Sequence, residues 1–333
     1  MYRRGKIIIL ILIVLTSALF ILDISVGAVD IPLHDVMAAF TGSDCPPVTA
    51  KIVMEIRLVK ALTAIAAGAA LAVSGLQMQT LFRNPLAGPY VLGISSGASL
   101  GVALFILGAP LLGASAIMQS VGITGSAWIG SALILVVISL LGHRIKDIMV
   151  ILILGMMFSS GVGAVVQILQ YLSRDEALKS FVIWTMGSLG DVTSEQLWIL
   201  LPAVIGGLAL AVSSIKPLNM LLAGEEYARS MGMNPRRSRA LIFTSTTLLA
   251  GTVTAFCGPV GFIGLAIPHV CRAIFENADH RTLIPGNILA GAAVMLACDI
   301  ISKALILPIN AITALIGIPV VIWVVIRNKS MTV

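Results

Sequence analysis

Apolar runs of about 20 residues follow one another along almost the whole chain, and they constrain its fold more than any other feature. The mean hydropathy is +1.05 and 11% of the residues are charged, whereas soluble domains carry roughly 25%. Runs of this length cross a bilayer as helices, because lipid offers no partner for free backbone groups. They lack the period-2 alternation of membrane β-strands. The sequence therefore predicts an all-α protein that crosses the membrane many times.

The apolar runs predict about ten membrane spans within a single transmembrane domain, residues 1–333. The first run follows three basic residues and is longer than the apolar part of a typical signal peptide, so a span is favoured over a cleaved signal. Glycine and proline interrupt the eighth run, which is tolerated where neighbouring protein or a cavity satisfies the freed backbone groups. The expected spans are 7–28, 56–80, 90–108, 123–142, 148–170, 195–214, 239–257, 259–275, 283–306 and 312–326.

The distribution of charge predicts how these spans are oriented. With both termini in the cytoplasm, the inner segments hold 15 of the 21 Lys and Arg residues and the outer segments hold six. Acidic residues divide the other way, five inside and ten outside, so the net charge of +6 combines +10 inside with −4 outside. An excess of basic residues on cytoplasmic loops is the usual pattern of membrane proteins. The positive charge therefore indicates topology rather than nucleic-acid binding.

Two segments of similar arrangement suggest an inverted internal repeat. Residues 68–98 and 251–292 each combine a helix rich in Gly and Ala, a turn containing proline and a second helix. The first begins outside and the second inside, which is a common arrangement in transporters. Small residues at near-helical spacing, such as Gly68, Ala72 and Gly75, let helix backbones approach closely, either within one subunit or between two.

Signatures of several enzyme classes are absent from the sequence. The four histidines form no H-E-x-x-H pair, and there is no G-x-x-x-x-G-K-[ST] loop for ATP. The letters G-I-S-S-G at 93–97 match a nucleophile elbow, but they open an apolar helix and follow no strand. The four cysteines form no C-x-x-C pair, and three lie in apolar runs, as small buried side chains do. We therefore expect no catalytic residue and no metal in this chain.

One cytoplasmic segment, Gly224–Arg239, is far more polar than its surroundings. Its first half predicts a short amphipathic helix, since Glu225 and Glu226 suit the positive N-terminal end and Gly232 suits the residue just past the C-terminal end. Asn234 before a proline predicts the N-cap of the next span. A rigid helix held between two spans suits the transmission of force to a soluble partner. Three arginines are expected at the inner lipid surface: Arg236, Arg237 and Arg239.

Basic residues lie at the outer ends of two spans. Arg57 and Lys60 are one helical turn apart at the mouth of the second span, and Lys303 can pair with Asp299 at i−4. Such side chains either extend to the membrane interface or grip acidic groups on an outer partner. On the inner side, the turn at 81–90 contains two prolines that prevent helix continuation, and on chemistry alone it is a turn between helices.

These segments together resemble the FecCD-type permeases, the membrane subunits of bacterial ABC importers for ferric siderophores, haem and cobalamin. The resemblance extends from about Asp30 to Arg327 and rests on several motifs in combination. The motifs are RLVKALTAIAAGAALAVSGLQMQTLFRNPLAGPYVLGISSGA (57–98), WTMGSLG (184–190), GPVGFIGLAIPHVCR (258–272), DHRTLIPG (279–286) and TALIGIPVVIWVV (313–325).

The resemblance implies an assembly. It implies ten helices per subunit in the type II importer permease fold and a second permease subunit, which forms a homodimer or a pseudo-dimer around a central path. It also implies two cytoplasmic ATP-binding subunits and an extracytoplasmic substrate-binding protein. ATP and Mg²⁺ would bind the ATPase subunits, and this chain would hold no cofactor. The chain would lie among the lipids of the bacterial plasma (inner) membrane, with both termini in the cytoplasm.

The resemblance also implies roles for particular residues. Asn84 and Leu86 match part of the family's cytoplasmic gate, whereas the loop at 143–147 does not clearly match its second element. Arg57, Lys60 and Lys303 match basic positions that pair with glutamates of the binding protein; two are Lys where Arg is usual, and Lys lacks the bidentate fork of Arg. Residues 224–232 sit where the family's coupling helices dock on the ATPase, and the implied coupling residues are Gly224, Glu225, Glu226, Arg229 and Gly232.

The expected function is therefore import of an iron chelate, a ferric siderophore, with haem or cobalamin (vitamin B12) as alternatives within the family. An ion-coupled secondary transporter would place charged residues deep in its spans as coupling sites, and the sequence places almost none there. An intramembrane enzyme would need the catalytic constellation that the sequence lacks.

Overall fold

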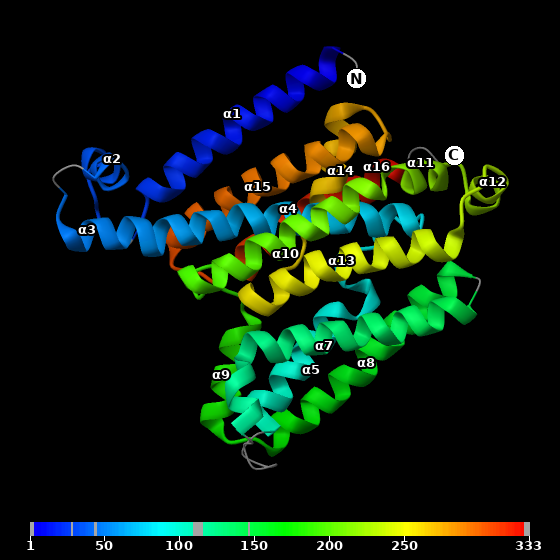
Figure 1. Cartoon of the computed structure of the whole chain (residues 1–333), viewed down its shortest axis with the longest axis horizontal. Helices are drawn as coiled ribbons and strands as arrows, with labels where there is room; N and C mark the ends of the chain where they lie inside the picture. The colour runs from blue at the N-terminus through cyan, green and yellow to red at the C-terminus, as the bar shows by residue number, and fades with distance from the viewer. Residues whose placement is uncertain (1–2, 28, 43–44, 109–115, 146, 330–333) are drawn as a thin grey trace.

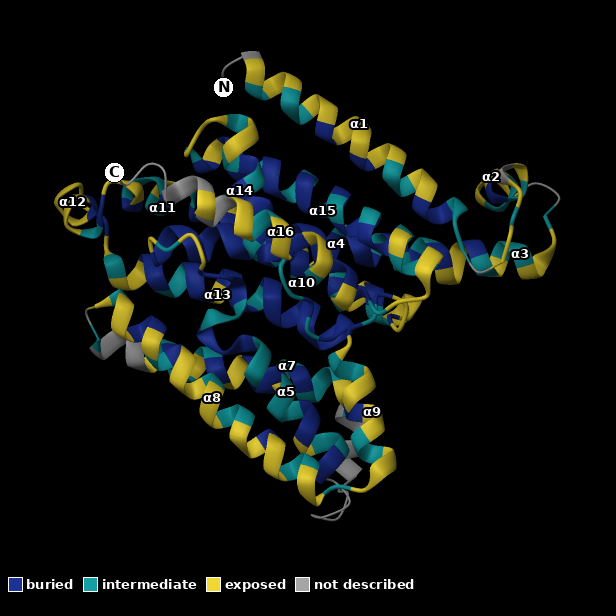
Figure 2. Cartoon of the chain, turned by 180° about the vertical axis from the view of Figure 1, so that it is seen from behind, coloured by how far each residue is buried: buried dark blue, intermediate teal, exposed yellow. Residues whose placement is uncertain are grey.

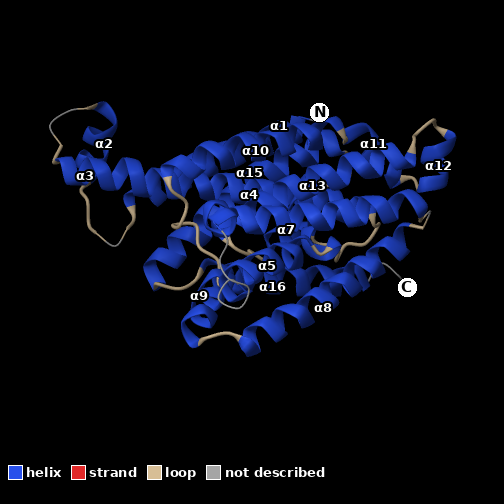
Figure 3. Ribbon diagram, turned by 60° about the horizontal axis from the view of Figure 1, so that its bottom comes forward, coloured by secondary structure: helices blue, strands red, loops and turns tan. Residues whose placement is uncertain are grey.

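A computed structural model describes residues 3–27, 29–42, 45–108, 116–145 and 147–329, and this part of the chain folds into helices joined by loops, with no strand (Figure 3). The prediction of an all-α protein is confirmed. In chain order the helices are α1 (Arg3–Ser25), α2 (Leu33–Thr41), α3 (Pro47–Lys51), the π-helix η1 (Ile52–Arg57), α4 (Leu58–Leu81), the 3-10 helix η2 (Pro89–Leu92), α5 (Ile94–Ala103), the π-helix η3 (Leu104–Gly108), α7 (Ala116–Arg144), α8 (Ile148–Leu172), α9 (Asp175–Thr185), α10 (Ser194–Ser213), α11 (Ile215–Leu222), α12 (Glu225–Ser230), α13 (Pro235–Cys257), α14 (Ile263–Phe275), α15 (His280–Leu305) and α16 (Ile309–Lys329).

Among the described residues, ten apolar helical segments correspond roughly to the ten expected spans. In the described part of the chain, seven are long and apolar enough to cross a membrane, and three are shorter: Ile94–Gly108, Ile263–Phe275 and Ile309–Trp323. The eighth segment starts later than expected because Gly258 and Phe262 have positive φ angles of 73° and 66°, which no α-helix allows. The second starts earlier, at Pro47, and continues for 35 residues through α3, η1 and α4. It is therefore longer than a bilayer is thick.

Helix α4 lies at the centre of the bundle. Helices α10, α13, α14 and α15 pack around it, and α1 lies along α15 (Figure 1). A second group, formed by α5, α7, α8 and α9, lies against this central group mainly through the packing of α7 on α13. Burial follows this arrangement, since α4 and α13 are largely buried whereas α1 and α8 expose most of their apolar residues (Figure 2). In a membrane those exposed faces contact lipid or another subunit.

Glycine permits the closest helix crossings. A Cβ built on Gly68 would overlap the carbonyl oxygen of Gly291 on α15, and one built on Gly75 would overlap the carbonyl oxygen of Gly264 on α14. Hence these backbones touch directly at two points along α4. The sequence left open whether such small residues pack within one subunit or between two, and the structure places Gly68 and Gly75 inside one subunit.

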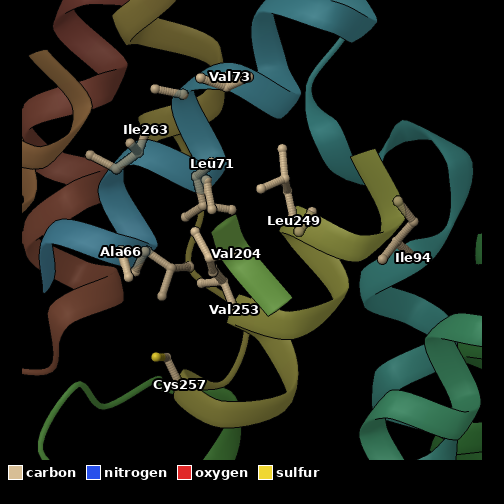
Figure 4. Packing of buried hydrophobic residues seen from close by; sticks show 14 of the residues in the cluster. Ala66, Leu71, Val73, Ile94, Val204, Leu249, Val253, Cys257 and Ile263 are labelled. Carbon is tan, nitrogen blue, oxygen red and sulfur yellow. The ribbon is translucent and has the colours of Figure 1, made fainter. Parts of the chain in front are cut away.

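The apolar core fills the space between α4, α10 and α13. Leu71, Val204, Leu249 and Val253 are buried there and point toward one another (Figure 4). Cys257, Cys271 and Cys298 are buried, and Cys45 is partly exposed. All four cysteines are free, as expected for a sequence without a disulfide framework.

Candidate functional site

The polar segment after Gly224 forms the short helix α12, and its ends are built as the sequence predicts. Gly224 precedes the helix at φ 109° and Gly232 follows it at φ 85°, both in a region that favours glycine. Asn234 is the N-cap of α13, since its Oδ1 accepts a hydrogen bond from the backbone N–H of Arg237 at 3.2 Å. Helix α12 projects from one end of the molecule, opposite α2 and α3 (Figure 1).

Glu225 fastens α12 to the rest of the protein. Its carboxylate accepts hydrogen bonds from Nη2 of Arg239 on α13 at 2.8 and 2.9 Å, and from Nη2 of Arg229 on α12 itself at 2.6 Å. Arg239 also donates to the backbone oxygen of Ile145, between α7 and α8, at 3.3 Å. The expectation that Arg239 lies at the lipid surface is therefore wrong: its side chain is buried, because Glu225 and the Ile145 carbonyl draw it inward. Arg236 and Arg237 are exposed, as expected.

The exposed face of α12, which points away from the helix bundle, is available to another protein. Glu226, Tyr227 and Met231 are exposed there, whereas Ala228 is buried against the bundle. The two neighbouring glutamates thus differ in position: Glu225 points toward α13 and Glu226 points away. A face that combines an aromatic ring, an apolar side chain and a charge is of the kind found in protein interfaces.

The turn that follows α4 lies close to α12. Asn84 closes it, since its Oδ1 accepts a hydrogen bond from the backbone N–H of Leu86 at 2.9 Å. The Leu86 side chain is exposed at the tip. A Cβ placed on Gly224 would lie 3.6 Å from Nη1 of Arg83, so the turn and the start of α12 are neighbours. We call residues 82–88 the inner turn.

Helix α14 holds the inner turn in place. Nε2 of His269 lies 2.7 Å from the backbone oxygen of Pro85. One turn further along α14, Arg272 donates to Oε1 of Gln79 at 2.6 Å, just before the end of α4. Gln79 in turn donates from Nε2 to the backbone oxygen of Leu265 at 3.1 Å. The inner turn therefore moves only if α14 or the end of α4 moves with it.

The three basic residues expected at the outer rim lie largely inside the structure. Arg57 is buried and donates to the backbone oxygens of Ile24 and Ser25 at 3.0 and 2.8 Å, which satisfies carbonyls at the C-terminal end of α1. Lys303 contacts both Asp23 and Asp299 at 2.9 Å, and Lys60 contacts Asp299 at 3.0 Å. Lys60 keeps 21% of its side chain exposed. These contacts within the chain satisfy the charged groups of all three basic residues, so no partner protein is needed to explain their positions.

The sequence predicted only part of this outer cluster. The spacing of Asp299 and Lys303 indicated their pairing, but Asp23 was not singled out, although it is the only acidic residue of the first apolar run. Both carboxylates are buried, so each requires a cation nearby. The cluster joins α1, α4 and α15 near the ends that are expected to face outward.

A second cluster, at the end expected to face the cytoplasm, was missed altogether, and we call it the inner cluster. Asn219 of α11 donates from Nδ2 to Oδ1 of Asp279 at 2.6 Å, and its Oδ1 faces Nδ1 of His280 at 2.7 Å. Nε2 of His280 lies 2.9 Å from Oγ1 of Thr80 near the end of α4. Burial raises the pKa of Asp279, but hydrogen bonds from Arg281 and Asn219 outweigh it and hold the pKa below its usual value. No group of three metal-binding side chains occurs among the described residues.

A bundle whose described part has seven helices long and apolar enough to cross a membrane, and a small polar helix exposed at one end, has the architecture of a multi-pass membrane protein. The chain matches the FecCD transport family over residues 12–327, and it belongs to that family. It is a multi-pass ABC importer permease.

Relatives cover most of the chain. The hemin transport system permease protein HmuU of Yersinia pestis is 37% identical over 83% of this chain and 84% of its own length. The vitamin B12 import system permease protein BtuC of Klebsiella pneumoniae is 35% identical over 84% of this chain and 83% of its own length. A solved structure, assigned to the metal-chelate type of ABC transporter and facing inward, superposes with a TM-score of 0.83 at 29% identity, covering 97% of this chain and 99% of that chain.

Proposed function

We propose that this chain forms the membrane path for an iron chelate of the ferric siderophore class, imported into a bacterial cytoplasm at the expense of ATP hydrolysed on separate subunits. The likeness to a metal-chelate type transporter over nearly the whole of both chains supports this cargo. The relatives named for hemin and vitamin B12 make those two compounds the rival cargoes.

The complete transporter contains a second copy of this chain, two ATP-binding subunits that hold ATP and Mg²⁺, and an outer binding protein. It lies in the plasma membrane with α12 and both termini in the cytoplasm. Helix α12 couples to the ATPase: Glu226 and the exposed face contact it, Glu225 and Arg229 brace the helix, and Gly224 and Gly232 shape its ends. The exposed face of α12 is the observation that carries this proposal.

Two further sites belong to the same proposal. Asn84 and Leu86 form part of the cytoplasmic gate, and the exposed Leu86 meets its counterpart on the second copy. On the outer side, Lys60 is the best placed of the three basic residues to reach a glutamate of the binding protein, because it is more exposed than Arg57 or Lys303. Arg57 and Lys303 contribute by shaping the surface around it.

The test is uptake into proteoliposomes that contain this chain, its cognate ATPase and its binding protein. The probes are a ferric hydroxamate siderophore, haemin and cyanocobalamin, each supplied with and without ATP inside the vesicle. We expect uptake of the ferric siderophore only, and only with ATP. Uptake of haemin or cyanocobalamin alone would assign the chain to that cargo, and uptake driven by an ion gradient without ATP would overturn the ABC mechanism.

A further inference from the structure

The inner cluster connects α12 to the inner turn through side chains for which the proposed function gives no role. Helix α11 leads directly into Gly224 and α12, and the end of α4 leads directly into the inner turn. Between them stands His280, the first residue of α15. It contacts Asn219 on one side and Thr80 on the other.

The hydrogen bonds of the cluster have a defined direction. Because the Asn219 amide nitrogen donates to Asp279, its oxygen is the atom that faces His280, where it accepts from the backbone N–H at 2.9 Å and from Nδ1 at 2.7 Å. A neutral His280 ring protonated on Nδ1 then presents Nε2 as an acceptor for the Thr80 hydroxyl, whose single proton is shared with the backbone oxygen of Leu76 at 3.0 Å. All the side-chain polar atoms of Asn219 are thereby paired with the start of α15.

Asn219 therefore ties α11 to a pair of helices that move as one body. Helices α4 and α15 are in direct backbone contact at Gly68 and Gly291, so they move together. His280 is 1% exposed, and a buried hydrogen bond of this kind is costly to break because water does not replace it. A displacement of α11 is thus passed to the α4–α15 pair, and then to the inner turn at the end of α4.

We propose that Asn219 and His280 are positioning residues that transmit the displacement of α11 and α12 to the inner turn. This inference rests on the proposed function and adds to it the connection between the coupling helix and the gate. Thr80 contributes by holding the His280 ring against α4. Leu218 and Leu221, which are buried on the same helix, attach α11 to the bundle by apolar contacts, and such contacts are not directional.

The principal variant is Asn219→Ala, and its matched control is Asn287→Ala. Asn287 is also buried, but its amide nitrogen donates only to Leu283 in its own helix. A second pair is Thr80→Val and Thr252→Val, because Thr252 is a buried threonine that accepts a hydrogen bond from Trp128, far from the inner turn. Valine keeps the shape of threonine and removes the hydroxyl.

The readout is the distance between nitroxide labels on Leu86→Cys in the two copies, in a Cys45→Ser background, with and without ATP and vanadate. Copurification of the cognate ATPase and ATP hydrolysis are measured on the same samples. In Asn219→Ala we expect the chain to keep its ATPase subunits and their ATP hydrolysis. The ratio of open to closed label distances that nucleotide produces should change by about fivefold to tenfold, which corresponds to the loss of one buried hydrogen bond. Thr80→Val should change it in the same direction, and both controls should behave as the unsubstituted chain.

Two results would overturn the inference. A full gate response in both Asn219→Ala and Thr80→Val would show that apolar packing alone transmits the motion. An equal loss in Asn287→Ala would show that any buried amide has the same effect. If the unsubstituted chain bound no ATPase and its labels did not respond to nucleotide, the proposed function would fail and this inference with it.

Discussion

Glu225 and Glu226 are neighbours in sequence, and the structure gives them different surroundings. Glu225 lies between Arg229 and Arg239, where it holds α12 against α13. Glu226 lies on the exposed face. Negative charge near a helix N-terminus is favourable for both residues, so the helix dipole alone does not distinguish them. Their contacts do.

Replacing the two glutamates separately should therefore give different results. Glu225→Gln weakens charge-assisted hydrogen bonds to Arg239, each worth about 1.5–3 kcal/mol, and we expect α12 to become susceptible to proteolysis and ATPase copurification to fall. Glu226→Gln should leave α12 protected and weaken ATPase binding only at low salt, because an exposed charge is screened. Limited proteolysis and copurification at two salt concentrations measure both effects. Equal protection of α12 in the two variants would contradict the bracing role of Glu225.

At the scale of single residues, the sequence predicted those features that depend only on residues close by along the chain. The glycines at 224 and 232 and the Asn234 cap follow from local backbone geometry, and all three are confirmed. The pairing of Glu225 with Arg239 could not be predicted, because the two residues are separated by a turn whose path depends on the packing of α12. Arg239 was for that reason assigned to the lipid surface.

At the scale of helices, the outer cluster holds α1 against α4 and α15. It consists of Asp23, Lys60, Asp299 and Lys303. Lys303 is the central member, since among the described residues of this cluster it alone contacts both Asp23 and Asp299. Removing one partner of a buried ion pair leaves an uncompensated charge and costs about 3–5 kcal/mol, whereas an exposed pair contributes about 0–1 kcal/mol.

Lys303→Met should therefore lower the unfolding midpoint of the detergent-solubilised chain strongly, and Lys51→Met should not. Lys51 is the control because it pairs with Glu55 on the exposed surface, with 71% and 57% of the two side chains exposed. Adding Asp23→Asn to Lys303→Met should restore part of the loss, since fewer unpaired carboxylates remain. An unchanged midpoint in Lys303→Met, accompanied by weaker binding of the outer protein, would instead favour docking as the main role of Lys303.

The positions of the membrane helices could be predicted, but their neighbours could not. Apolar runs fix where helices form, because the bilayer demands continuous hydrogen bonding. Which helices touch depends on shape, as at Gly75 and Gly264, and these residues are 189 positions apart. Asp23 was missed for the same reason, since its partners come from α15.

At the scale of the whole molecule, the two ends differ in character. Helix α12 lies at one end with the inner turn beside it, α2 and α3 lie at the other end, and α1 runs so that its N-terminus is on the side of α12 (Figure 1). Arg4 of α1 contacts Glu276, which follows α14, at 3.5 Å, and this places the N-terminal region beside another segment expected in the cytoplasm. The order of the segments agrees with the charge asymmetry of the sequence.

A native cysteine reports the orientation directly. Cys45 is the only partly exposed cysteine, and it lies between α2 and α3. A membrane-impermeant maleimide should therefore label the chain in right-side-out spheroplasts and fail to label it in inside-out vesicles. Cys45→Ser should abolish the labelling, because Cys257, Cys271 and Cys298 are buried. Labelling in inside-out vesicles only would reverse the proposed orientation.

Helices α4 and α15 are held together at three levels: Lys60 with Asp299 at the outer end, Gly68 with Gly291 along their length, and Thr80 with His280 at the inner end. Contacts at three separated points along two helices oppose both sliding and rotation of one helix against the other. We therefore expect α4 and α15 to move as one body and any hinge to lie between helix groups, where α7 of the group formed by α5, α7, α8 and α9 packs on α13.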